Sequence, residues 1–251
     1  MGKQLGILPL KATMDNMTFY QSKDGMRVKK QTKISKERIQ NDKNFAKLRK
    51  NNIEFTNAAR AAKLLRISVT GILSDVTDGR VVSRLFALMV KAAKADMTNP
   101  RGERNVLDGD LHFLEGFNFN VKSHLNTVLK ASFVSSVDRV TGKLEIQIPS
   151  FTPATMLEKP KDATHFKLIS AGTELDFPGN VSVKKEYESD FLPLNNVATA
   201  VIDIVHQLTA NNVHPLFLLL GVTFFSKVNG DYEPAGGLEF NALSIVAIST
   251  L

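Results

Sequence analysis

The chain has 251 residues, of which 43% are hydrophobic and 23% charged, enough for one large domain or two small ones. It has no cysteine and no tryptophan, which excludes disulfides, thiolate nucleophiles and cysteine-based metal sites. A lack of cysteine suits a reducing cytosol but is also compatible with export. The apolar stretch in residues 1–10 is too short for a secretory signal, so we expect a cytoplasmic protein or export without a cleavable signal. The apolar run 215–225 is too short for a membrane helix and is interpreted as a buried strand.

Charge is unevenly distributed along the chain. Residues 1–66 hold 16 lysines and arginines against five acidic residues, whereas residues 67–251 hold 16 against 20. A basic N-terminal part and a mildly acidic remainder favour two kinds of partner, a polyanion or the acidic part of a neighbouring copy. The alternative is a solvated helix face that only keeps the protein soluble.

Residues 1–33 are predicted to form an extended β-hairpin arm. Asp15-Asn16 and Asp24-Gly25 are turn signals, and the second is typical of a type I′ turn between short strands. So small a segment cannot be stable alone, so it must pack on the rest of the chain or on another subunit. We expect its assembly contacts to be Leu8, Leu10, Phe19, Tyr20 and Val28.

Residues 34–98 are predicted to form a long antiparallel helical hairpin. Its first helix spans residues 42–73 and is capped by Asp42, with Ser35 capping a shorter turn before it. A second helix follows, capped by Thr77 or Asp78, and ends at Asn99-Pro100. The apolar stripe expected on the first helix contains Phe45, Leu48, Asn52, Phe55, Ala59, Ala62, Leu65, Val69 and Ile72. The face expected on the second contains Val81, Val82, Leu85, Leu88, Met89 and Ala92.

Residues 99–126 are predicted to be a connector with a short helical turn near 111–117, and residues 127–251 a seven-stranded β-sandwich. The strand candidates are 127–138, 143–149, 163–171, 180–187, 197–206, 213–228 and 238–249. Thr141-Gly142 and Asn229-Gly230 mark hairpins. Regular short strands favour an immunoglobulin-like sandwich, nearer the fibronectin III type because no cysteine pair or tryptophan is present. The predicted fold class is therefore α+β.

Three blocks carry a resemblance to a known family. They are ILPL-x-A-T-x-x-x-MTFYQSKDG-x-x-V-K-K, then SKERI-x-x-D-x-NFA-x-L-R-x-N-x-x-EF, and the final FNALSIVAI. The first two resemble the N-terminal half of a family of bacterial proteins of about this length, and the third resembles that family's last strand. Members of that family more often carry glycine where Ala12, Asp15 and Asn16 stand. No function is assigned to the family, so the resemblance implies kinship and no chemistry.

No catalytic, cofactor or metal signature is present. The Asp108–His112 stretch begins like a calcium loop but has Phe113 and Phe119 where an EF-hand needs glycine and glutamate. Ser182 and Lys185 match S-x-x-K but lie on a predicted strand, without the motif's helix and companion motifs. No nucleotide-binding glycine motif occurs. We therefore predict no enzyme, no catalytic residue, no cofactor and no metal.

A self-assembling structural protein is the preferred hypothesis, forming a filament or other homopolymer through the β-arm and helical hairpin. The first alternative is nucleic-acid binding through the basic face of helix 42–73, and the second is an adhesive or scaffold module. No small-molecule substrate is indicated. The expected contacts with a polyanion or acidic partner are Lys29, Lys30, Lys43, Lys47, Lys50, Arg60 and Lys63.

Overall fold

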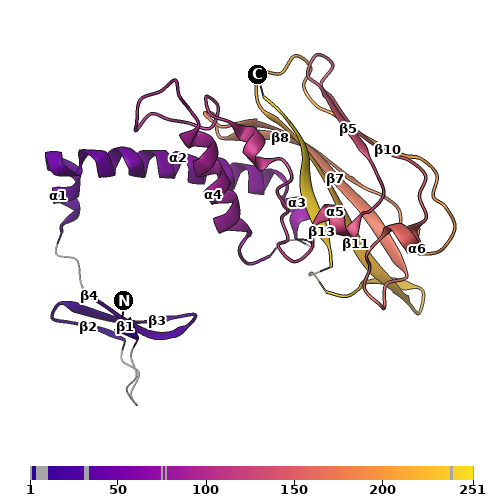
Figure 1. The fold of residues 1–251 in the computed structure, drawn as a ribbon, viewed down its shortest axis with the longest axis horizontal. Helices are drawn as coiled ribbons and strands as arrows, with labels where there is room; N and C mark the ends of the chain where they lie inside the picture. The colour runs from indigo at the N-terminus through magenta and orange to yellow at the C-terminus, as the bar shows by residue number, and fades with distance from the viewer. Residues whose placement is uncertain are drawn as a thin grey trace. The chain divides into compact units, whose positions relative to one another are not determined.

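The computed structural model describes residues 2–3, 11–30, 34–74, 76, 78–237 and 240–250 (Figure 1). The chain divides into two compact units, Met1–Arg49 and Lys50–Leu251. As predicted, the fold is of mixed helix and antiparallel sheet.

The first unit contains a four-stranded antiparallel sheet in the order β1-β4-β3-β2. Leu8 and Leu10 lie outside the described residues. The strands are β1 (Gly2–Lys3), β2 (Ala12–Met14), β3 (Met17–Ser22) and β4 (Gly25–Lys30). A positive φ of 55° at Asp15 allows the tight turn that pairs Met14 with Met17.

The hairpin predicted at Asp24-Gly25 is present between β3 and β4, but the predicted type I′ geometry is wrong. The turn residues are Lys23 and Asp24, and Gly25, with φ of 105°, already pairs with Ser22 as the first residue of β4. The positive φ therefore follows the turn, an arrangement that also depends on glycine.

The predicted helix over 42–73 is interrupted twice. It consists of a 3-10 turn η1 (Lys43–Phe45), the long helix α2 (Ala46–Ser68) and α3 (Thr70–Leu73), after the short α1 (Lys36–Asn41). Both predicted caps are present, because Ser35 Oγ accepts from Arg38 N at 3.1 Å and Asp42 Oδ1 from Asn44 N at 2.9 Å. Val69, with φ of −115° and ψ of 19°, separates α2 from α3.

The apolar stripe predicted for the first helix is confirmed at Ala62, Leu65 and Val69, which are buried, and is wrong nearer the N-terminus. Asn52 and Ala59 are exposed, whereas Glu54 and Ala58 are buried. The buried row of α2 comprises Glu54, Ala58, Ala61, Ala62, Leu64, Leu65 and Ser68. This row faces a β-sheet as well as the second helix, so the sheet decides which side is buried.

The second helix, α4 (Val81–Lys94), crosses α2 steeply instead of lying alongside it as a hairpin (Figure 1). Phe55 and Phe86 meet edge to face with their ring centroids 6.1 Å apart. The predicted cap at Asp78 is wrong, because Arg80 is at the N-cap position and Asp78 Oδ1 only accepts from Arg80 N, at 2.5 Å. The alternative cap, Thr77, lies outside the described residues. Val82 is 58% exposed and does not belong to the apolar face. The helices cross because each packs separately against the sheet.

The connector contains a 3-10 helix η2 (Leu111–Leu114) where a helical turn was predicted. The helix α5 (Leu125–Val128) then occupies the start of the first predicted strand, whose β-structure begins only at Val134. The last helix is α6 (Pro153–Met156).

Two antiparallel sheets form the rest of the second unit. The small sheet has the order β10-β6-β5, and the large sheet the order β12-β11-β7-β8, with β13 also pairing with β11 and β9 with β7. Each of the seven predicted strands overlaps an observed one, and the short β9 and β12 were not predicted. Asn229 and Gly230 both have positive φ (52° and 102°), as the predicted hairpin requires. The strands are β5 (Val134–Asp138), β6 (Lys143–Ile148), β7 (His165–Asp176), β8 (Val181–Glu188), β9 (Leu192–Pro193), β10 (Ile202–Gln207), β11 (Leu216–Val228), β12 (Asp231–Pro234) and β13 (Ala242–Ser249).

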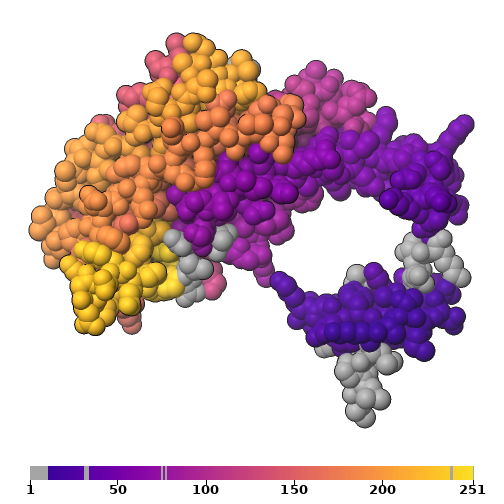
Figure 2. Space-filling model, turned by 180° about the vertical axis from the view of Figure 1, so that it is seen from behind, coloured from indigo at the N-terminus to yellow at the C-terminus, as the bar shows by residue number. Residues whose placement is uncertain are grey.

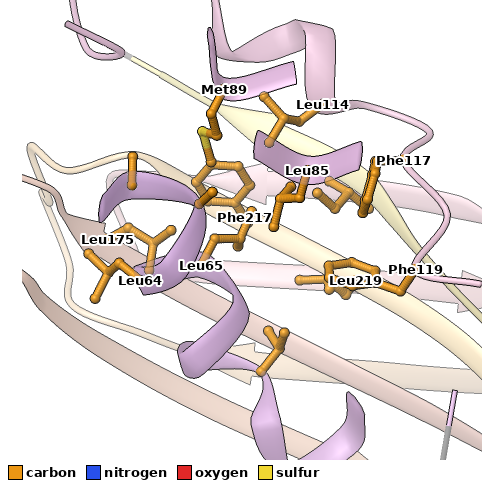
Figure 3. Packing of buried hydrophobic residues seen from close by; sticks show 14 of the residues in the cluster. Leu64, Leu65, Leu85, Met89, Leu114, Phe117, Phe119, Leu175, Phe217 and Leu219 are labelled. Carbon is orange, nitrogen blue, oxygen red and sulfur yellow. The ribbon is translucent and has the colours of Figure 1, made fainter. Parts of the chain in front are cut away.

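The large sheet is covered on both faces along residues 216–224 of β11, so this part of β11 is buried without alternation. Leu218 and Leu220 pack in a cluster with the small sheet's Leu144 and Ile146. Residues on the opposite face pack against α2, α4 and η2, and in Figure 3 Phe217 lies among Leu65, Leu85 and Met89. Full burial of one such side chain stabilises the fold by roughly 1.5–3 kcal/mol.

Candidate functional site

A concave surface of the second unit has one wall on α2. Asn57, Arg60, Leu64 and Ile67 recur every three or four residues and therefore share one side of the helix, with Lys63 beside them. Leu64 is buried, whereas Arg60 and Lys63 are exposed. This side of α2 thus combines an apolar base with two cationic side chains.

A second wall is the loop after α4, which the buried carboxylate of Asp96 organises. Its Oδ1 accepts from the backbone N–H groups of Thr98 and Asn99, both at 2.9 Å. Its Oδ2 accepts from the Asn99 side chain at 2.8 Å and from Asn105 N at 3.2 Å. Burial disfavours the charge, but these hydrogen bonds outweigh it and lower the pKa of Asp96 to about 2. The charged carboxylate therefore fixes the loop that carries Val106 and Leu107.

The third wall is the turn between β7 and β8. Asp176 Oδ1 accepts from Gly179 N at 2.9 Å, and a Cβ at Gly179 would lie only 2.1 Å from Asp176 Oδ2. Asn180 has a positive φ of 53°. The turn therefore depends on glycine and asparagine, and it holds Phe177 and Ser182 towards α2.

Together the three walls enclose an open groove of about 900 Å³, within the range of ligand-binding clefts. In Figure 2 the orange end of the large sheet lies against the purple α2. Asp108, the acidic residue of the lining, accepts at 2.7 Å from both the Asn99 and Asn105 side chains, so the loop already holds it. The groove is lined by Asn57, Arg60, Lys63, Leu64, Ile67, Asn105, Val106, Leu107, Asp108, Phe177, Pro178, Asn180 and Ser182.

The predicted basic residues do not form a single face. Lys50 lies in the row of Glu54, Ala58 and Ala61, and its aliphatic stem covers Gly102. Arg60 and Lys63 point roughly 80–140° away from Lys50 around the helix axis, at 3.6 residues per turn. Two of the predicted contacts, Arg60 and Lys63, thus line the groove, and Lys50 does not. The other four, all exposed and in the first unit, are Lys29, Lys30, Lys43 and Lys47.

The N-terminal sheet has one apolar and one polar face. Residues paired across antiparallel strands point to the same side, so Phe19 shares a face with its partner Val28, and Tyr20 shares the other with Arg27. Tyr20 has Lys29 Nζ 5.5 Å from its ring centroid. None of residues 11–30 and 34–49 is buried. The mostly apolar face, called the apolar face below, carries Ala12, Met14, Met17, Phe19, Met26 and Val28, together with the polar Gln21 and Lys30.

A serine and a histidine meet inside the second unit. Ser170 Oγ donates to Leu219 O at 2.6 Å and lies 2.8 Å from His206 Nε2, which leaves the imidazole N–H as the donor in that contact. Burial lowers the pKa of His206 from 6.5 to about 4, so the ring is neutral at pH 7. The hydroxyl is fully buried between the sheets, which makes this a core hydrogen bond.

No protein-family model, curated protein or solved structure matches the chain. Within the described part of the chain, no helix is long and apolar enough to span a membrane. The same part contains no group of three or more metal-ligating side chains.

Proposed function

We propose that the chain is a non-enzymatic, self-assembling structural protein that forms a filament or other homopolymer. The observation that carries this proposal is the apolar face of the N-terminal sheet. Met14 is 58% exposed and Met17 52% exposed, and they are cross-strand partners on that face. Such a sheet becomes stable when its apolar side is covered, and the same face of a second copy would cover it. Identical faces pair only in twos, so a longer polymer also needs a second contact elsewhere on the chain.

The two facing sheets of the second unit support a module suited to assembly. The seven longer strands β5, β6, β7, β8, β10, β11 and β13 can be lettered A to G in chain order. The small sheet then has the order E-B-A and the large sheet the order D-C-F-G. A constant-type immunoglobulin sandwich divides into ABED and CFG, so only the fourth strand differs in its sheet. We propose on this basis an immunoglobulin-like module of the fibronectin III style, with helices covering the outer side of its larger sheet.

Nucleic-acid binding is the second candidate, favoured by the exposed lysines of the first unit. Lys29, Lys43 and Lys47 are exposed, and Lys29 lies beside the ring of Tyr20. A gel shift with non-specific DNA that weakens steeply with salt would favour this function. Charge reversal at Lys29, Lys43 and Lys47 should then abolish that shift.

Paired substitutions on the two faces of the N-terminal sheet test the assembly proposal. Met14→Lys/Met17→Glu places opposite charges across one strand pair of the apolar face and leaves the net charge unchanged. Thr13→Lys/Thr18→Glu does the same one residue away, where Thr13 pairs with Thr18 on the polar face. We expect wild type and the threonine variant to assemble in electron micrographs and sedimentation, and the methionine variant to lose the sheet-mediated contact.

A monomeric wild type at high concentration would contradict self-assembly. Equal assembly of all three proteins would show that the apolar face does not form the assembly contact. Retention of a different protein partner by wild type, without self-assembly, would instead favour the scaffold alternative.

A further inference from the structure

The groove carries two cationic groups without acidic partners. Arg60 and Lys63 are three residues apart on α2, which places their Cβ atoms roughly 5–6 Å apart. Within the described residues, neither forms an ion pair, and both are exposed. Apolar walls lower the local dielectric and strengthen attraction for an incoming anion. The groove is therefore suited to a ligand with two negative charges and a small apolar surface.

The hairpin between β11 and β12 has the complementary surface. Asp231 and Glu233 alternate with Tyr232, so both carboxylates lie on one side, next to Val228, the cross-strand partner of Asp231. Neither carboxylate forms an ion pair within the described residues, and Val228 is 43% exposed. Tyr232, on the other side, stacks on Phe191 with 3.8 Å between ring centroids. The acidic side of the hairpin is thus left to solvent.

The hairpin cannot enter the groove of its own molecule. Phe225 of β11 pairs with His165, so the hairpin lies beyond the start of β7. The turn that forms the groove follows Asp176 at the end of β7. At about 3.3 Å per residue these ends are roughly 35–40 Å apart. Only a second molecule can bring an acidic hairpin to this groove.

We propose that the groove binds the Asn229–Glu233 hairpin of a second copy, with Asp231 and Glu233 facing Arg60 and Lys63. Two carboxylates two residues apart on a strand lie roughly 6–7 Å apart, which matches the spacing of the two cations. The contact joins opposite ends of the large sheet, so it is head-to-tail and repeats without limit unless it closes into a ring. This groove–hairpin contact rests on the proposed self-assembly. It adds a second, polar contact to the one between the apolar faces.

Two charge-reversed variants test the contact. Arg60→Glu/Lys63→Glu makes the groove acidic, and Asp231→Lys/Glu233→Lys makes the hairpin basic. Each variant alone meets only like charges, so its half-assembly concentration in sedimentation should rise at least about tenfold. An equimolar mixture restores opposite charges at both kinds of junction and should assemble as an alternating polymer. Lys43→Glu/Lys47→Glu is the control, because it reverses the charge of two exposed lysines that lie outside the groove.

The outcomes separate this contact from the general proposal. If wild type does not assemble, the proposed function fails together with this contact. If wild type assembles and either variant alone assembles equally well, the groove–hairpin contact is wrong while self-assembly stands. A mixture that stays as dispersed as its components, although circular dichroism shows both are folded, also overturns it. Equal loss of assembly in the control would show a general charge effect and contradict the specific contact.

Discussion

The buried His206 should make the stability of the second unit pH-dependent. Burial lowers its pKa from 6.5 to about 4, so below pH 6.5 the unfolded chain binds a proton that the folded chain does not. This contribution to stability is complete above pH 6.5, decreases as pH falls and levels off below pH 4. Between pH 7 and pH 4.5 the loss is about 2–3 kcal/mol. In urea titrations, His206→Leu should lose less stability over this range than wild type.

The matched control is Ile204→Val, a buried substitution on the same strand that removes no titratable group. It should keep the pH dependence of wild type. An unchanged pH dependence in the His206 variant would show that the imidazole is not held neutral by burial.

The stability of the folded chain should depend on the negative charge of Asp96. Its carboxylate satisfies the Asn99 side chain and three backbone N–H groups. Asp96→Asn turns one acceptor into a donor, which should cost about 3 kcal/mol at pH 7. The pKa is lowered from 3.8 to about 2, so the contribution is present above pH 3.8 and lost as pH falls towards 2. Asp162→Asn, at an exposed site, should change urea stability little.

How far a residue's role can be predicted depends on whether its partners are local in sequence. Ser35 and Asp42 cap helices through backbone groups two or three residues away, and both caps were predicted correctly. Glu54 instead accepts from Gly102 N at 2.6 Å, a partner 48 positions along the chain. Nothing near Glu54 in the sequence indicates that contact, so its burial could not be predicted.

At the scale of elements, the packed side of α4 can be tested with two neighbouring residues. Leu85 is 1% exposed and Val82 58% exposed. Leu85→Ala should cost about 2–5 kcal/mol because it leaves a cavity beside the sheet. Val82→Ala should change stability by under about 0.5 kcal/mol. Thermal or urea unfolding of the two variants measures both, and similar losses would contradict the packing of α4.

Strands were easier to predict than helix faces. Leu144, Ile146 and Ile148 alternate within β6, and Asn229-Gly230 specifies its turn through its own φ angles, so both signals are local. The alanine-rich middle of α2 offers several nearly equivalent sides. Residues such as Phe217 and Leu219, more than 140 positions away, decide which one is buried. The predicted stripe was therefore displaced in the first part of the helix, and the predicted antiparallel alignment with α4 was wrong.

At the scale of the molecule, the Lys50–Leu251 unit contains both hydrophobic clusters and should fold without the N-terminal sheet. A chain beginning at Ala46, where α2 starts, should unfold cooperatively within a few degrees of the full chain, because the removed residues contain none that is buried in the described structure. Calorimetry measures this. A collapse of the transition would show that the second unit depends on the first.

The groove could be predicted only in part. Arg60 and Lys63 were predicted as contacts from charge alone, because an exposed basic helix side is visible in the sequence. Phe177 and Asn180, which form the facing wall, are more than 100 positions further along the chain. Their approach depends on how β7 and β8 pair and how α2 crosses the sheet. No pattern in the sequence marked the acidic hairpin as a contact. Its charges complement those of the groove only when both surfaces are folded.

The two proposed contacts should respond to salt in opposite ways. The groove–hairpin contact is ionic and partly exposed, so it weakens as the screening length falls from about 10 Å at 0.1 M salt to about 3 Å at 1 M. The contact between apolar faces is not screened, and excluded salts strengthen it. Identical faces pair with twofold symmetry, which closes after two copies.

In a sulfate series followed by sedimentation velocity, wild type should therefore pass from long assemblies to dimers. Met14→Lys/Met17→Glu, which keeps only the ionic contact, should instead pass to monomers. Wild-type assemblies that grow steadily with salt would show that no ionic contact limits them.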